Sequence, residues 1–194
     1  MAVIALFPRL VAAQPLDISK FAGEDWYGLY LNGQKSGFLM SSILQEKDNT
    51  IAVIEDAQFK MLMQNVRQDL RTYSKHIYAA DGALISFEQT VQDSKGTSAF
   101  EGVVEAGGLK LTSTVGGTTK VDTLPVPKEG LRDALKQSML ANPNAKIGDK
   151  IAFSYFEPIM AAEDEGRSEI KAEETRVLEG VPTKVFEIET HLAF

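Results

Sequence analysis

Side chains alternate between apolar and polar along most of this chain, and this alternation constrains the fold more than any other feature. Ile51, Val53 and Phe59 fall on one face of an extended segment, and Leu70 and Thr72 share a face of the next. A period of two is that of a half-buried β-strand, because successive side chains point to opposite faces. Short turns rich in Gly, Asn and Asp separate the segments, at 48–49, 81–82, 94–96, 107–108, 116–117 and 179–180. Short connections make neighbouring strands antiparallel, so the pattern predicts a meander.

The expected strands cover residues 26–32, 35–46, 50–63, 66–79, 83–92, 97–105, 108–115, 118–124, 150–157, 168–179 and 183–192. One segment, 129–141, departs from this period, because Leu131, Leu135 and Met139 recur every four residues before Asn142-Pro143. That spacing predicts one amphipathic helix whose apolar stripe is buried on the concave side of the sheet. The expected fold class is therefore mainly β: a curved antiparallel meander sheet, a half-barrel of about ten to eleven strands, with one amphipathic helix packed on it.

The segment WYGLYLNGQKSGFLMSS, residues 26–42, predicts a hairpin with Asn32-Gly33 as a two-residue turn. Counting outward from that turn places Gly28 opposite Gly37 and Tyr27 opposite Phe38. A glycine pair leaves a notch in the ribbon, which either admits a ligand or lets the sheet curve. We favour curvature, because barrels use glycines in this way.

An apolar run, MAVIALFPRLVAAQPLD, opens the chain, with small residues at 11–13. We interpret residues 1–13 as the remnant of a secretory signal cleaved after Ala13, residues 14–25 as a linker and residues 26–194 as a single antiparallel β domain. The corresponding expectation is an exported, periplasmic protein. No later segment has the 18 or so apolar residues that a membrane span needs, so we expect no transmembrane segment.

Composition excludes several classes of function. The net charge is -7 with acidic residues throughout, so no basic face is expected for nucleic acid. There is no cysteine, and His76 and His191 lie in no recognisable metal motif, so we expect no metal, cofactor or catalytic residue. Acidic neighbours such as Glu55-Asp56 and Glu173-Glu174 point to opposite faces of a strand and cannot act together on one substrate. The acidic run 161–169 is expected to be an exposed loop.

Methionine fills irregular space and tolerates varied ligands, so its distribution suggests where a cavity would lie. The residues expected to form a cavity or a partner-binding face are Trp26, Tyr30, Met40, Met61, Met63, Leu131, Leu135 and Met139. The alternative is that these residues form an ordinary packed core.

Several runs resemble, in order, the N-terminal β domain that precedes bacterial transglutaminase-like domains. WYGLYLNGQKSGF resembles the opening hairpin of that family, and LKLTSTVGGTTKVDTLPVP resembles its late strands and proline linker. KIGDKIAFSYFEP and IKAEETRVLEGVPTKVFEIET resemble its closing elements. These runs span most of the chain from residue 26.

The resemblance implies a curved sheet of the kind seen in bacterial lipoprotein carriers. It also implies a non-catalytic accessory or scaffold role beside a downstream or separate transglutaminase-like domain, by packing on that domain or presenting a peptide. The catalytic domain would follow residue 194, so we expect the β domain to be truncated at its C-terminus or to be a free-standing relative. The alternative function is a periplasmic lipid or lipoprotein carrier that binds an acyl chain between the sheet and the helix.

Overall fold

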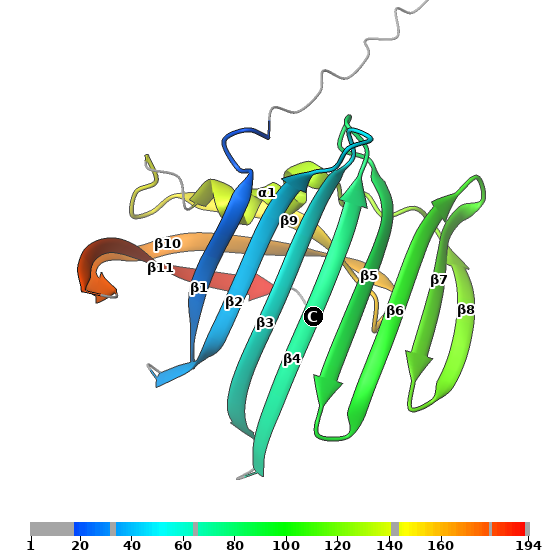
Figure 1. Ribbon diagram of the computed structural model, residues 1–194, viewed down its shortest axis with the longest axis horizontal. Helices are drawn as coiled ribbons and strands as arrows, with labels where there is room; N and C mark the ends of the chain where they lie inside the picture. The colour runs from blue at the N-terminus through cyan, green and yellow to red at the C-terminus, as the bar shows by residue number, and fades with distance from the viewer. Residues whose placement is uncertain (1–17, 32–33, 64–65, 141–143, 179, 193–194) are drawn as a thin grey trace, which may run out of the picture.

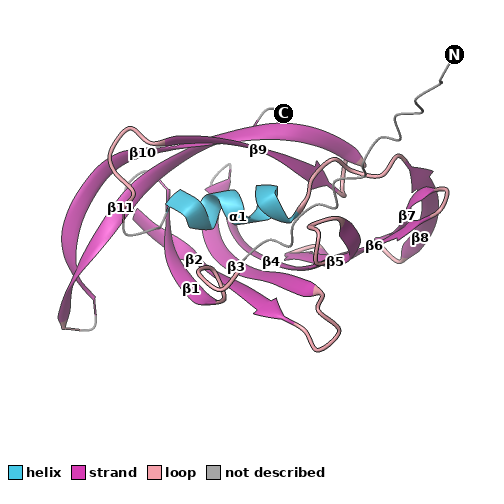
Figure 2. Ribbon diagram, turned by 90° about the horizontal axis from the view of Figure 1, so that it is seen from above, coloured by secondary structure: helices cyan, strands magenta, loops and turns pink. Residues whose placement is uncertain are grey.

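The computed structural model describes residues 18–31, 34–63, 66–140, 144–178 and 180–192. Within these ranges the chain forms eleven strands in two antiparallel sheets and one helix (Figure 1). The first sheet is curved and not closed (Figure 2). The mainly β half-barrel with one helix, expected from the period of the sequence, is therefore confirmed.

Eight consecutive strands form the larger sheet, and each pairs with its neighbour in sequence. They are β1 (Gly23–Leu31), β2 (Gln34–Gln45), β3 (Ile51–Met63), β4 (Val66–Tyr78), β5 (Leu84–Asp93), β6 (Gly96–Glu105), β7 (Gly108–Val115) and β8 (Thr118–Leu124). Their bounds follow the turn signals of the sequence to within a few residues.

The remaining elements cross the concave side of this sheet. Helix α1 (Leu131–Leu140) is followed by β9 (Lys150–Glu157), β10 (Ala162–Leu178) and β11 (Val181–Leu192), which form a separate sheet in the order β11-β10-β9. Figure 2 shows α1 between the two sheets. The late strands do not extend the meander at β8, because the segment that contains α1 carries the chain back over the concave face.

Strand β10 begins earlier than the sequence predicts. The acidic segment 161–169 was expected to be an exposed loop, and this prediction is wrong from Ala162 onward. Glu163 and Glu165 are exposed and alternate with less exposed residues, and Gly166 and Ser168 further along are buried. The segment therefore has the period of a strand with one face exposed to solvent.

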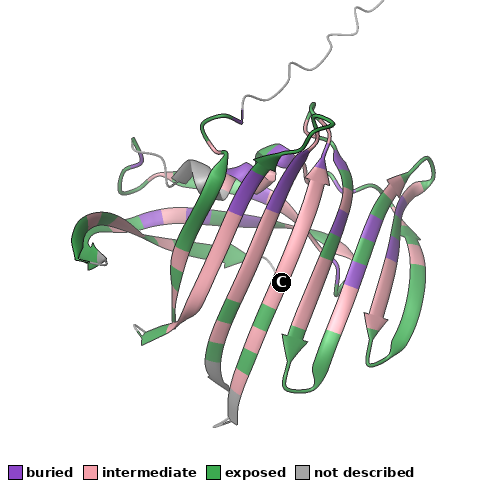
Figure 3. Ribbon diagram, in the orientation of Figure 1, coloured by how far each residue is buried: buried purple, intermediate pink, exposed green. Residues whose placement is uncertain are grey.

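The main core lies between α1 and the end of the large sheet nearest to it (Figure 3). Leu131 and Leu135 are fully buried, as the helical spacing predicted. Ile18 also belongs to this core and β1 begins at Gly23, so residues 18–25, expected as a linker, pack with the domain. A second, smaller cluster joins Ala145 to Ile170, with apolar side chains of β9 and β11 around them.

Carboxylates beside and within α1 occupy the outer edge of β9. Asp133 Oδ1 accepts a hydrogen bond from the backbone N–H of Ser154 at 3.2 Å, and Glu129 Oε2 accepts one from Phe156 at 2.6 Å. Unpaired N–H groups at a sheet edge invite pairing with another strand. These carboxylates satisfy such groups and tie α1 to the second sheet.

The first hairpin differs from its predicted register. Leu31 pairs with Gln34 and Tyr30 with Lys35, as counted from the sequence, whereas the turn residues 32–33 lie outside the described ranges. A β-bulge then leaves Ser36 unpaired, so Leu29 faces Gly37 and every later pair shifts by one. The predictions that Gly28 faces Gly37 and that Tyr27 faces Phe38 are therefore wrong; Gly28 faces Phe38.

The two glycines of this hairpin have different surroundings. A Cβ atom on Gly37 would overlap the carbonyl oxygen of Gln58 and lie 2.7 Å from the Cα of Phe59, both in β3. A Cβ on Gly28 would meet only the ring of Tyr30, at 3.0 Å, and that ring is the far end of a flexible side chain. Close approach of β2 to β3 therefore requires glycine at 37 and not at 28.

We expect Gly37→Ala to destabilise the protein by about 2 kcal/mol or more, because the backbone of β3 must move to admit a methyl group. Gly28→Ala is the matched control and should change stability by no more than about 0.5 kcal/mol. Urea unfolding of the two variants checks this, and equal losses of stability would contradict it.

Candidate functional site

A row of polar side chains crosses the concave face of the large sheet. Strand pairing places Ser41 of β2 beside Glu55 of β3, Glu55 beside Ser74 of β4, and Ser74 beside Gln89 of β5. Direct cross-strand neighbours share a face and have Cβ atoms roughly 5 Å apart. Glu55 shares its face with Val53 and Ile51, which belong to the core beneath α1. The polar row, as we call these four residues, therefore faces the interior of the half-barrel.

All four members of the polar row are half-buried, and none forms a side-chain hydrogen bond or ion pair with any described residue of the chain. Buried polar groups in proteins almost always have hydrogen-bond partners, and those that have none call for an explanation. Partial exposure offers an explanation for the polar row. Water can hydrate these groups in the free protein, and a ligand can replace that water.

Glu55 is the charged member of the row. Burial of its carboxyl group raises its pKa above the usual value for glutamate. Its side chain nevertheless keeps some accessible surface. No described cation pairs with this carboxyl group.

The polar row separates two parts of the concave face. On the side of α1, the neighbouring row contains Ile43, Val53 and Phe87, all of which are buried in the core. On the other side, the residues are Leu39, Ala57, Thr72 and Val91, then Phe59 and Leu70, and all of these are half-buried. Figure 3 shows this change from buried to half-buried along β2 and β3. We call the half-buried part the open half of the concave face.

His76 lies two residues from Ser74 along β4, in the row next to the polar row on the side of the core. Its ring stacks on Phe87 at 5.5 Å and on Tyr78 at 6.2 Å between ring centroids. Burial lowers the pKa of His76 to about 4, so the imidazole is neutral near neutral pH. A neutral imidazole presents one donor and one acceptor and adds no charge to the interior.

Glu129 brings a second carboxyl group to the same interior. Beyond its bond to Phe156, it accepts a longer hydrogen bond from the Tyr78 hydroxyl at 3.5 Å. Burial raises the pKa of Glu129 to about 7, and the negative charges of Asp133 and Glu55 add to this rise. Burial also raises the pKa of Tyr78, so this hydroxyl stays protonated. Glu55 therefore lies close enough to Glu129 for its negative charge to raise the pKa of Glu129.

The residues predicted from the sequence lie in three places. Trp26, Tyr30 and Met40 lie on the convex face, where the exposed fraction is 63% for Trp26 and 50% for Tyr30. Leu131 and Leu135 lie in the packed core. The side chains of Met61, Met63 and Met139 lie outside the described part of the structure. The described members of this set therefore do not line one cavity, and Tyr30 contacts Arg176 of β10, which donates a hydrogen bond to its hydroxyl at 3.2 Å and lies 5.3 Å from the centroid of its ring.

The paired carboxylates separate as the strand geometry predicts. Glu55 faces the concave side, while Asp56 on the convex side accepts two hydrogen bonds from Arg71, at 2.7 and 3.1 Å. Glu173 and Glu174 pair with Lys184 and Arg176 near the tip of the β10-β11 hairpin. In the described ranges, no three His, Asp or Glu residues are arranged to hold a metal ion.

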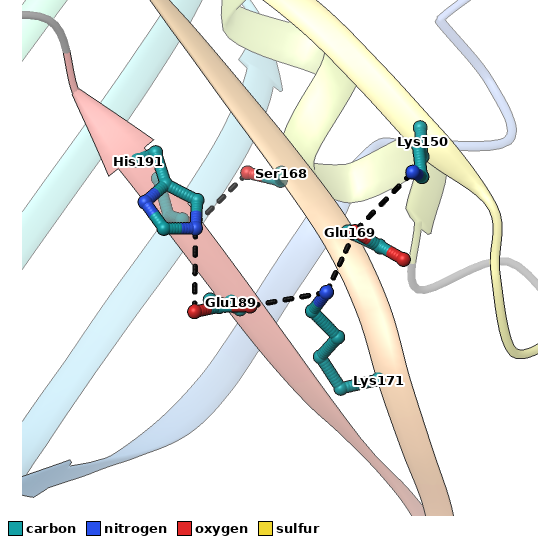
Figure 4. Close-up of polar contacts among 7 residues, drawn as sticks. Lys150, Ser168, Glu169, Lys171, Glu189 and His191 are labelled. Atoms are coloured by element: carbon teal, nitrogen blue, oxygen red, sulfur yellow. Dashed lines mark hydrogen bonds and ion pairs between the residues drawn. The ribbon is translucent and has the colours of Figure 1, made fainter.

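The second sheet carries a ladder of exposed charges (Figure 4). Lys171 Nζ lies 2.7 Å from a carboxylate oxygen of Glu169 and 3.2 Å from one of Glu189, and Glu189 also contacts the exposed His191 at 3.2 Å. Exposed pairs of this kind contribute at most about 1 kcal/mol each. The ladder is a solvated surface whose members satisfy one another.

A hollow of about 470 Å³ lies at the ends of β3, β4 and β5 that are remote from α1. Its lining consists of Gln58, Asp69, Leu70, Arg71, Gln92, Asp93 and Ser94. Arg71 is already paired with Asp56, and the Ser94 hydroxyl donates to Gln68 at 3.0 Å. Because its main donors are engaged, this hollow is a weaker candidate than the polar row.

Fold and site together define an open antiparallel half-barrel with a polar row on its concave face. Comparison with family models, curated proteins and solved structures found no match. In the described ranges, the single ten-residue helix lacks the length and apolar character for crossing a bilayer.

Sequence analysis did not identify the polar row. One signal was present, because Glu55 interrupts the apolar face formed by Ile51, Val53, Ala57 and Phe59. A carboxylate in such a stripe has to be paired or functional. Ser41, Ser74 and Gln89 gave no such signal, since each becomes significant only through its register with Glu55.

Glu129 should make stability depend on pH. Its pKa is about 7 in the folded protein and 4.5 ordinarily, so the folded state binds the proton more tightly. The resulting stabilisation is complete below pH 4.5 or so and is lost as the pH rises to about 7. Glu129→Gln stays neutral and can still accept from Phe156, so it should remove this loss and leave the opposite dependence of His76, whose lowered pKa makes stability rise with pH over the same range. Near pH 8 it should exceed the original protein by on the order of 2 kcal/mol.

Urea unfolding over this pH range measures the effect. Glu101→Gln, at an exposed position of β6, is the control and should leave the profile unchanged. If the stability of the Glu129→Gln protein changes with pH in the same way as that of the original protein, Glu129 is not the responsible group.

Proposed function

We propose that this chain is a non-catalytic binding domain whose concave face holds an apolar chain, such as the acyl chain of a lipid. The observation that carries the proposal is the open half of the concave face. Leu39, Ala57, Phe59, Leu70 and Val91 point inward there but remain half-buried, whereas their counterparts beneath α1 are buried. Apolar side chains that face inward and remain accessible are what an apolar ligand would cover.

The geometry suits a long, narrow ligand. The sheet is curved (Figure 2), and side chains on the inner face of a curved sheet point toward a common space. From Glu55 to Phe59 the strand rises roughly 13 Å, which a medium-length alkyl chain spans. Removing such a chain from water contributes about 0.8 kcal/mol for each buried methylene group.

The accessory role beside a transglutaminase-like domain, suggested by the resemblance, is a second proposal. It is favoured by the exposed aromatic residue Trp26 on the convex face of the edge strand β1. Large exposed aromatic side chains are enriched at protein interfaces. The two roles use opposite faces and do not exclude each other. Export also remains a prediction, because residues 1–13 lie outside the described ranges.

The carrier proposal predicts that the protein binds decanol, an uncharged amphiphile, with one molecule for each chain. Phe59→Ser and Leu70→Ser should each weaken this binding by about fivefold or more, because each removes apolar surface from the open half. Isothermal titration calorimetry measures both affinity and stoichiometry.

Ile54→Ser is the matched control, since Ile54 is also half-buried but lies on the convex face of β3. It should leave decanol binding unchanged. Absence of decanol binding by the original protein, or equal losses in all three variants, would count against the proposal.

A further inference from the structure

We propose that the ligand of the concave face carries an ammonium group, which the carboxylate of Glu55 binds together with the hydroxyl groups of Ser41 and Ser74. This inference rests on the proposed function and names the chemical class of the ligand's polar end. It concerns an amphiphile with one apolar chain and one protonated amine.

Position is the first argument. The polar row lies at the boundary between the packed core and the open half of the concave face. An apolar chain that covers Phe59 and Leu70 can extend along the strands as far as Glu55 and no further, because Val53 and Ile43 are buried there beneath α1. The polar end of such a ligand would therefore meet the polar row.

Charge is the second argument. The interior contains the carboxyl groups of Glu55 and Glu129, and Asp25 on β1 continues the polar row beyond Ser41. The same row first reaches a cation at Lys120 on β8, five strand spacings or roughly 24 Å from Glu55, and that lysine is paired with Asp122. A carboxylate or phosphate head group would meet like charge here, whereas a cation would neutralise it.

Hydrogen bonding is the third argument. An ammonium group has three donors and no acceptor. The polar row supplies the carboxylate of Glu55 and, directly on either side, the hydroxyl oxygens of Ser41 and Ser74, none of which is engaged by a described residue. Gln89 adds an amide oxygen one strand further along. Burial disfavours the ionised form of Glu55, which an ammonium group would stabilise and a hydroxyl head group would not.

The test compares three ligands of equal chain length at about pH 8, where an alkylamine is protonated. Decylamine should bind about tenfold more tightly than decanol, because a charge-assisted hydrogen bond replaces a neutral one. Decanoate should bind more weakly than decanol. Calorimetry on the full chain gives all three affinities.

Two variants test whether the preference for decylamine over decanol depends on the polar row. Glu55→Gln should abolish the advantage of decylamine over decanol while decanol still binds, and Ser74→Ala should reduce that advantage several-fold. Glu88→Gln is the control, because Glu88 is an exposed carboxylate on the convex face of β5. It should preserve the ranking of the ligands.

The outcomes separate the two proposals. If decanol binds but decylamine binds no more tightly, or if decanoate binds best, the ammonium inference is overturned and the carrier proposal survives. An advantage of decylamine that persists in Glu55→Gln also overturns the inference. If decanol and decylamine both fail to bind, both proposals fail. Should Glu55→Gln not fold, the ligand ranking of the original protein and the Ser74→Ala variant decide.

Discussion

Burial of Leu131 and Leu135 against one end of the large sheet is the contact on which the rest of the structure depends. Both side chains are completely enclosed, and they fix α1 over the ends of β2 to β5. Helix α1 runs across the strands (Figure 1), so its width of roughly 10 Å leaves most of the length of strands of up to thirteen residues uncovered. The concave face is consequently divided into a packed part and an accessible part, and this division creates the conditions for a binding surface.

Much of this architecture follows from the sequence, because strand period and turn chemistry are local properties. The eight-stranded meander and α1 could be predicted in this way. The bulge at Ser36 could not, since the polar and small residues Lys35, Ser36 and Gly37 show no apolar-polar alternation that would reveal where the two faces of the strand exchange. The separation of β9, β10 and β11 into a second sheet also depends on where α1 directs the chain, which no local pattern records.

The same distinction applies to the candidate site. Glu55 stands out in its own strand as a carboxylate among apolar residues, so one member could have been found from the sequence. Its neighbours Ser41, Ser74 and Gln89 are ordinary strand residues that only register brings together. Residues chosen for their flexibility or aromatic character, such as Met40 and Trp26, lie on the opposite face. Alternation alone divides each strand into two faces and does not show which face lines the concave side of the half-barrel.

The pairing of β1 to β8 strictly with sequence neighbours has a consequence for the order of folding. Each hairpin needs only the next strand of the chain, so loop-closure costs are small and contacts are local for an all-β sheet. The sheet can therefore grow in the order in which the chain emerges during synthesis. Helix α1 comes afterwards, so the apolar surface that it covers stays uncovered until then. That interval is when this protein is most exposed to aggregation.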